Sequence, residues 1–264
     1  MGDRVRSFQF SGEGFVPPST ADFNLPPAFG HSEYTTKPVF LVFLSIIVVS
    51  AFFIAASRKA AIVPSKLQFA GESIYSFVRH DLGEEIIGHE FMRFVPFLFT
   101  LFTFVLTNNV FGIVPFLQFP AMSHVGFPYV LALFSFFIFH AVGIKKQGLG
   151  KYLKGIAFMP GVPKFVYILL TPIEIATFFI VRPLTLSLRL FANMFAGHLL
   201  LLVFITGGDY MLHDSHTFLK ILSPFSFTMG IGMTFFEFMV QCLQAYIITL
   251  LTALFIAGAL ADEH

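Results

Sequence analysis

The sequence predicts an all-α integral membrane protein with about five membrane helices and one amphipathic helix. Of its 264 residues, 56% are apolar and only 12% are charged, whereas about 25% of a soluble domain is charged. Residues 94–144 contain no Asp, Glu, Lys or Arg, and residues 221–261 contain only Glu237. Each segment exceeds the roughly 20 apolar residues that cross a bilayer.

Charge and cysteine content exclude several function classes. The net charge of +1 provides no basic field for nucleic acid, so no nucleic-acid partner is expected. Cys242 is the only cysteine, which excludes intramolecular disulfides and multi-cysteine metal sites. We expect no cofactor, no bound metal and no catalytic residue.

The first 36 residues differ from the rest of the chain. Residues 1–36 form a polar leader that lacks the basic start and short apolar core of a cleaved signal peptide. Residues 37–264 form the membrane domain, which opens with a helix at about 38–57. Basic residues follow this helix at once, so the positive-inside rule places its end in the cytoplasm and the N-terminus outside.

An amphipathic helix is expected at about 66–91, lying at the membrane surface or against a partner. Within it, His80, Glu84 and His89 raise the alternative of a metal site, because imidazole and carboxylate groups one turn apart can share a ligand. The zinc-protease pattern needs a second His four residues after the first, and that position after His89 is Arg93. The metal alternative is therefore not favoured.

The uncharged block that follows is too long for one span. Prolines cluster near its middle, which predicts two helices at about 93–116 and 125–144 joined by an outer loop. Four lysines then follow within ten residues, at 145, 146, 151 and 154. This lysine-rich loop is expected in the cytoplasm.

The last two apolar stretches, about 163–206 and 218–261, are separated by the segment GGDYMLHDSHT. A helix of forty residues measures about 60 Å, twice the hydrocarbon thickness. Each stretch is therefore either broken in two or steeply tilted; Pro183 could kink the first, and Pro224 lies near the start of the second. The shortage of internal loop signals favours two long helices strongly tilted as a hairpin, with a cytoplasmic C-terminus.

Ionisable groups inside these two stretches are the candidate functional residues, since each costs about 2.5–3.5 kcal/mol to insert. On an ideal helix Arg189 and Asn193 share a face with Arg182, whereas His198 points to the opposite side. On the last helix Glu237, Gln241 and Gln244 form one polar stripe, at i, i+4 and i+7. The candidates are Glu174, Arg182, Arg189, Asn193, His198, Glu237, Gln241 and Gln244.

These residue types are typical of a proton route. A His and a carboxylate in a membrane cavity can exchange protons near neutral pH. An arginine stays protonated, so it can only act as a fixed positive barrier that attracts a carboxylate. No carboxylate of this chain obviously matches Arg189, and we expect its partner to come from another subunit.

The stretch RPLTLSLRLFANMFAGHLLL, residues 182–201, resembles the signature segment of the a subunit of rotary F-type ATP synthases. The segment TNNVFGIVP at 107–115, the spacing from Glu237 to Gln244 and the terminal Glu-His support the resemblance. It implies a non-catalytic stator subunit of the membrane sector, with two offset proton half-channels. Its partners would be the c-subunit ring, b-type peripheral stalk subunits, the whole F1Fo complex and the lipid bilayer.

The resemblance also implies residue roles. Arg189 would be the essential arginine that faces the c ring, with Asn193 and Gln244 nearby. His198 and Glu237 would line the outer half-channel. Glu174 would belong to the cytoplasmic side, although its distance to Pro183 is one residue longer than the commoner pattern; Gly112 also stands where some members carry an acid. A multi-pass protein of a bacterial plasma membrane is expected.

Two other function classes are the alternatives to this interpretation. A secondary ion-coupled transporter also places ionisable groups at mid-membrane, but such proteins usually show two related halves, and no internal symmetry is visible here. An intramembrane hydrolase needs a nucleophile and a base, and Ser187 has no His three or four residues away. The amides Asn108 and Asn109 are interpreted as helix–helix contacts rather than channel lining, and His140 as an interfacial or packing residue.

Overall fold

The computed structural model describes residues 15, 17–18, 37–58, 61–114, 117, 121–157, 165–213 and 217–260. Throughout these ranges the ordered elements are helices, and none is a strand. Four helices in the described chain are long and apolar enough to cross a membrane, and a fifth apolar helix is shorter. The predicted all-α membrane fold is therefore confirmed.

The first membrane helix, α1, covers Lys37–Ser57 and leads into a surface helix, α2, at Lys66–Phe77. The Ser65 hydroxyl caps α2 by accepting a hydrogen bond from the Gln68 backbone N–H at 3.3 Å. The two helices pack closely at Gly71, where a Cβ would lie 3.1 Å from the Cβ of Ala56. A small residue is therefore needed at this crossing.

The amphipathic region is divided into several pieces rather than the single helix expected at 66–91. After α2 come a π-helical segment at Val78–Glu84, the short α3 at Glu85–Ile87 and a 3₁₀ segment at Gly88–Arg93. The division at Gly88 has a clear cause, since its φ of 74° lies in the left-handed region that glycine tolerates best.

The middle of the chain forms α4 at Val95–Val110, α5 at Gly126–Gln147 and α6 at Leu149–Ala157. At 1.5 Å per residue α4 is about 24 Å long, somewhat less than the hydrocarbon layer. A glycine with a φ of 81°, Gly148, ends α5 and lets the chain turn into α6. The expected lysine-rich loop thus contains a short helix.

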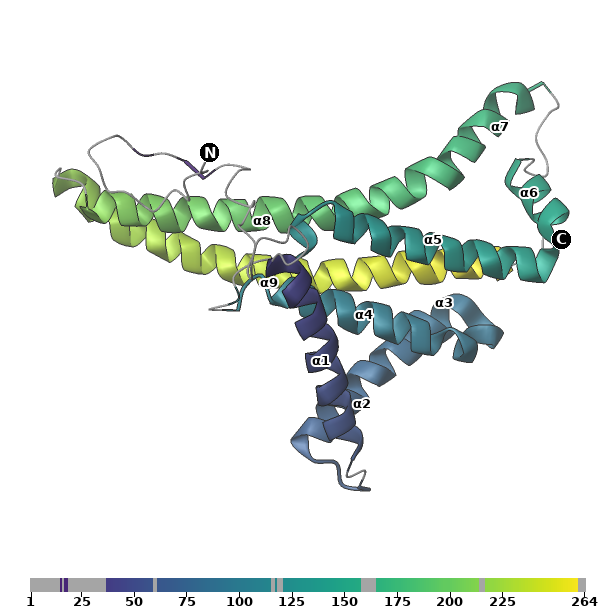
Figure 1. The fold of residues 1–264 in the computed structure, drawn as a ribbon, viewed down its shortest axis with the longest axis horizontal. Helices are drawn as coiled ribbons and strands as arrows, with labels where there is room; N and C mark the ends of the chain where they lie inside the picture. Colours follow the sequence, from purple (N-terminus) through teal and green to yellow (C-terminus); the bar gives the residue numbers. More distant parts are fainter. Residues whose placement is uncertain are drawn as a thin grey trace, which may run out of the picture.

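The C-terminal half is a long antiparallel hairpin (Figure 1). Helix α7 at Tyr167–Ala176 runs through a π-helical segment at Thr177–Val181 into α8 at Arg182–His213. Helix α9 follows at Thr217–Leu260. Its 44 residues correspond to about 66 Å of helix, so it fits a bilayer only when strongly tilted.

The hairpin turn occupies only the end of the segment that was expected to separate the two helices. Most of the segment expected to separate the helices is itself helical, because α8 continues to His213. Gly208 allows close packing instead of a turn, since a Cβ there would lie 3.3 Å from the ring of Phe227 and the side chain of Ser226.

The apolar core lies where α4 and α5 pack against the middle of this hairpin. Figure 1 shows α5 running along the hairpin, with α4 beside α9. The central side chains Leu98, Leu190, Met194 and Ile248 are each at most 2% exposed. This packing fixes the register between α8 and α9, and hence the relative positions of their polar residues.

Candidate functional site in the helical hairpin

A carboxylate lies buried at the centre of α9. The Glu237 side chain is 3% exposed, and its Oε1 accepts a hydrogen bond from Gln241 Nε2 at 3.2 Å. The two residues are one turn apart, so the bond follows from helix geometry. The Oε2 atom of Glu237 has no hydrogen-bond partner within the described chain.

A glycine on α8 makes room for this carboxyl group. A Cβ added to Gly197 would lie 3.3 Å from the Cγ, Cδ and Oε1 atoms of Glu237. Any larger residue would press on the carboxylate, so Gly197 belongs to the site although sequence reasoning gave it no role. The next residue, His198, is only 7% exposed. The imidazole and the carboxylate are thus both buried, on adjoining stretches of α8 and α9.

An amide pair joins the helices further along the same interface. Asn193 Nδ2 donates to Gln244 Oε1 at 2.7 Å. Asn193 precedes Gly197 on α8, whereas Gln244 follows Glu237 on α9. This order is the one expected for two antiparallel helices, so both contacts fit the same pairing of α8 with α9. The structure therefore places four of the predicted residues along one face of the hairpin: Asn193, Glu237, Gln241 and Gln244.

Arg189 lies on the exposed surface of α8, one turn before Asn193. Its side chain is exposed, between Leu188, which is 44% exposed, and the buried Leu190. It forms no ion pair, hydrogen bond or ring contact with any residue that the structure describes. An unpaired charge on the apolar surface of a membrane protein is costly. Arg189 is therefore a cation without a counter-charge in the part of the chain that the structure describes.

Glu174 and Arg182 lie apart from this interface, where α7 joins α8. Glu174 is half-buried, and the guanidinium of Arg182 lies 3.8 Å from the ring centre of Phe178. The π-helical segment separates the two charged residues, and the Arg182 N–H bonds to the Thr177 carbonyl, five residues back. A π turn takes up one residue more than an α turn. It would thus accommodate the extra residue that the family resemblance implies between Glu174 and Pro183.

Two asparagines of α4 connect the site to the rest of the membrane domain. Asn109 Nδ2 donates to the backbone oxygen of Gln241 at 3.2 Å, and Asn108 Nδ2 donates to Ser45 Oγ at 2.9 Å. These contacts bind α4 to α9 and to α1, which agrees with the interpretation of both residues as helix–helix contacts. Asn109 also brings α4 directly behind the polar stripe of α9.

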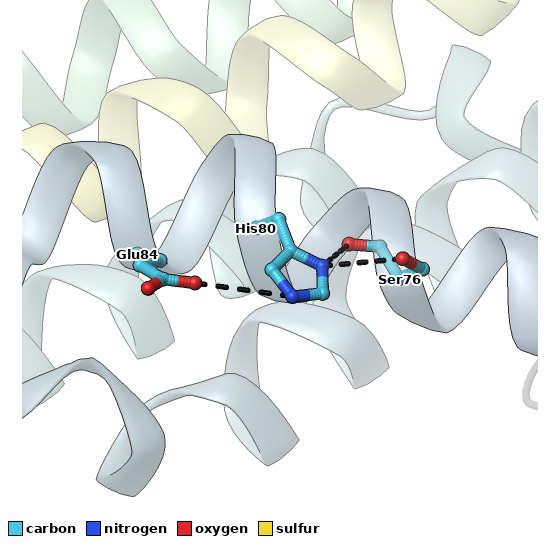
Figure 2. A network of polar contacts seen from close by, with 3 residues as sticks. All are labelled: Ser76, His80 and Glu84. Atoms are coloured by element: carbon cyan, nitrogen blue, oxygen red, sulfur yellow. Dashed lines mark hydrogen bonds and ion pairs between the residues drawn. The ribbon is translucent and has the colours of Figure 1, made fainter.

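The possible metal ligands on the surface form a local helix contact. His80 Nδ1 lies 3.1 Å from Ser76 Oγ, and His80 Nε2 lies 3.9 Å from a carboxylate oxygen of Glu84. Figure 2 shows the three side chains along one helix. His89 does not join them: no group of three His, Cys, Asp or Glu residues suited to a metal ion occurs in the described chain. The metal alternative gains no support.

Comparison with known proteins identifies the family. Residues 39–257 match the model of the ATP synthase A chain family. The chain is 47% identical to the "ATP synthase subunit a" of a Nocardioides species, covering 96% of both chains. It is 45% identical to that of Pseudarthrobacter chlorophenolicus, over 97% of both chains, and 38% identical to that of Streptomyces lividans, over 97% of this chain and 91% of the relative. The chain therefore belongs to the ATP synthase A chain family, whose members are subunits of the membrane sector of the ATP synthase.

Proposed function

We propose that this chain forms two offset proton half-channels and drives rotation of a c-subunit ring through Arg189. The observation that carries the proposal is the placement of charge on α8. A cation is exposed on the outside of the hairpin, without a partner in the described chain, while an acid and polar groups are buried inside it. A carboxylate of a neighbouring subunit would form an ion pair with Arg189.

The outer half-channel would follow the polar face of the hairpin. Glu237 and His198 would pass protons along it, with Gln241 as a hydrogen-bonding neighbour of the carboxylate. Buried polar atoms normally have partners, yet one oxygen each of Glu237, Gln241 and Asn109 has none in the described chain. Water is the partner that would satisfy these atoms in the working protein, and a chain of water carries protons.

Arg189 would separate the two half-channels. Its guanidinium keeps its proton at every physiological pH, so it cannot pass protons on. It repels a proton crossing directly from one half-channel to the other, and it attracts a ring carboxylate that has just lost its proton. Asn193 and Gln244, hydrogen-bonded to each other at 2.7 Å, would hold the α8–α9 register next to it.

Glu174 would serve the cytoplasmic half-channel. This role places the end of α5 and the start of α8 on the cytoplasmic side of a bacterial plasma membrane, with the N-terminus outside and the C-terminus in the cytoplasm. The lysines at the end of α5 favour this orientation. The chain itself would be non-catalytic, with ATP chemistry performed by other subunits of the F1Fo complex and b-type subunits completing the stator.

The proposal is tested by ATP-driven proton pumping in inverted membrane vesicles that contain the whole synthase. Arg189→Ala is expected to abolish pumping, whereas Arg93→Ala serves as the matched control, because Arg93 is an exposed arginine outside the hairpin. Assembly is checked by the amount of synthase in the membrane. Pumping at the parental rate by an assembled Arg189→Ala synthase would falsify the proposal.

A further inference from the structure

A second polar cluster lies where α5, α6 and the start of α8 meet. The hydroxyl oxygen of Tyr152, on α6, is hydrogen-bonded to Nδ1 of His140, on α5, at 2.9 Å. Both residues are buried, although α6 is a short helix beyond the end of a membrane span. Burial raises the pKa of Tyr152 to about 12, so its hydroxyl keeps its proton throughout the physiological range.

Gly143 and His140 form a binding surface on α5 for the side chain of Tyr152, which we call its seat. Its ring lies directly on Gly143, and a Cβ at that position would overlap the ring. The glycine is one turn after His140, so α5 offers both a flat surface for the ring and a partner for the hydroxyl. This seat fixes the position of α6 against α5 and fixes the orientation of the imidazole.

The imidazole in turn contacts the π-helical segment. The His140 ring is stacked on Phe179, with 5.1 Å between centroids and 10° between planes, and meets Phe178 edge-on at 5.5 Å. We call these four side chains the aromatic bracket: His140, Tyr152, Phe178 and Phe179. The bracket links α6, through α5, to the segment that carries the extra residue between Glu174 and Pro183.

The bracket also positions a cation. The guanidinium of Arg182 lies 3.8 Å from the ring centre of Phe178 and 4.9 Å from that of Phe255 on α9. A cation held over two aromatic faces is fixed more firmly than a free surface arginine. The two charges nearest to Arg182 along the chain are the Glu174 carboxylate, which interacts with it electrostatically, and Arg189.

The π turn brings Glu174 towards the same side as Arg182. In a straight α-helix a separation of eight residues leaves two side chains about 80° apart around the axis. A π turn uses more residues for the same rotation, which reduces that angle. The local distortion therefore reduces the angle around the helix axis between the Glu174 carboxylate and the Arg182 cation.

We propose that the aromatic bracket holds Arg182 as a positioning residue for proton exchange at Glu174. The cation attracts the carboxylate and keeps it facing the path, while Arg182 itself neither gains nor loses a proton. The inference rests on the proposed function, because it assigns a role within the cytoplasmic half-channel. It adds a cation that is distinct from Arg189 and an aromatic support that extends to α6.

The local electric field at position 174 provides a direct test. Glu174→Cys is introduced with Cys242→Ser, which removes the only native thiol. In inverted vesicles with the assembled synthase, the rates of labelling by an anionic and a cationic methanethiosulfonate reagent are compared. We expect Arg182→Gln to lower the anionic-to-cationic rate ratio several-fold and Arg182→Lys to preserve it. Arg93→Gln, which removes another cation near a phenylalanine ring, is expected to leave the ratio unchanged.

A milder variant covers the case in which Arg182→Gln does not assemble. Tyr152→Phe keeps the ring on Gly143 and loses only the hydrogen bond to His140, so a smaller fall in the same ratio is expected. An unchanged ratio in both Arg182→Gln and Tyr152→Phe, or an equal fall in Arg93→Gln, overturns the proposal. The labelling ratio does not depend on pumping, so this result is separate from the test on Arg189.

A pumping experiment then tests whether Arg182 acts through Glu174. Arg182→Gln is expected to slow ATP-driven pumping in the parental background and to cause no further loss in the Glu174→Gln background. A merely structural role for Arg182 would add its own loss in both backgrounds. Equal fold-losses in the two backgrounds would therefore contradict positioning through the carboxylate.

Discussion

Gly197 allows the packing of the buried carboxylate to be tested with a graded series. In Gly197→Ala, helix propensity favours the variant by up to about 1 kcal/mol. Against this, the new methyl group would lie 3.3 Å from three atoms of Glu237, a few tenths of an ångström closer than carbon atoms prefer. Overpacking costs about 1–3 kcal/mol, and contacts only a few tenths of an ångström too short belong at the low end of that range, so the two effects nearly cancel for Ala. For Val, with two further methyl groups, the crowding dominates.

The expected result is therefore a loss of function that exceeds the loss of stability. Gly197→Ala should leave the thermal stability of the purified complex nearly unchanged yet slow proton pumping several-fold, because displacement of Glu237 breaks its 3.2 Å hydrogen bond with Gln241. Gly197→Val should abolish pumping. Gly232 is the matched control, since a Cβ there has no neighbour within 4 Å. Parental pumping in Gly197→Val, or equal losses in the Gly232 variants, would refute the reasoning.

Further predictions concern the remaining contacts. Asn193→Leu and Gln244→Leu should each slow pumping, and the double variant should be no worse than the poorer single variant, because both remove the same 2.7 Å hydrogen bond; additive losses would contradict this. Asn109→Leu should lower the free energy of unfolding of the complex by about 1 kcal/mol, the value of a membrane hydrogen bond. The comparison is Thr100→Val, on the exposed side of α4. Gly143→Ala should release α6, detected as faster proteolysis within 149–157; protection equal to the parent would exclude the seat for Tyr152.

The membrane architecture was accessible from the sequence because lipid imposes a simple rule. Segments without charges must be helical, and their lengths set the number of spans. The stripe from Glu237 to Gln244 was equally accessible, since neighbours on one helix follow from its period alone. The predicted roles of these residues in proton transfer remain a proposal.

Features that depend on contacts between distant helices were not accessible. The segment after residue 206 was expected to separate the two helices, but it begins inside α8, where Gly208 provides close packing against Phe227. Gly197 had no assigned role because its importance depends on the register between α8 and α9, which the core packing sets. His140 was interpreted as an interfacial or packing residue, and only the structure reveals its hydrogen bond to Tyr152.

The central claim is that Arg189 faces a carboxylate on a neighbouring ring subunit. The most direct measurement is crosslinking by a photoactivatable reagent attached to the cysteine of Ala192→Cys, in a Cys242→Ser background within the assembled synthase. Ala192 is exposed and lies one turn from Arg189. Ala141→Cys, on the exposed side of α5, is the control. The account predicts an adduct with the small ring subunit from position 192 and none from position 141. Adducts from position 192 that contain only lipid or this same chain would contradict it.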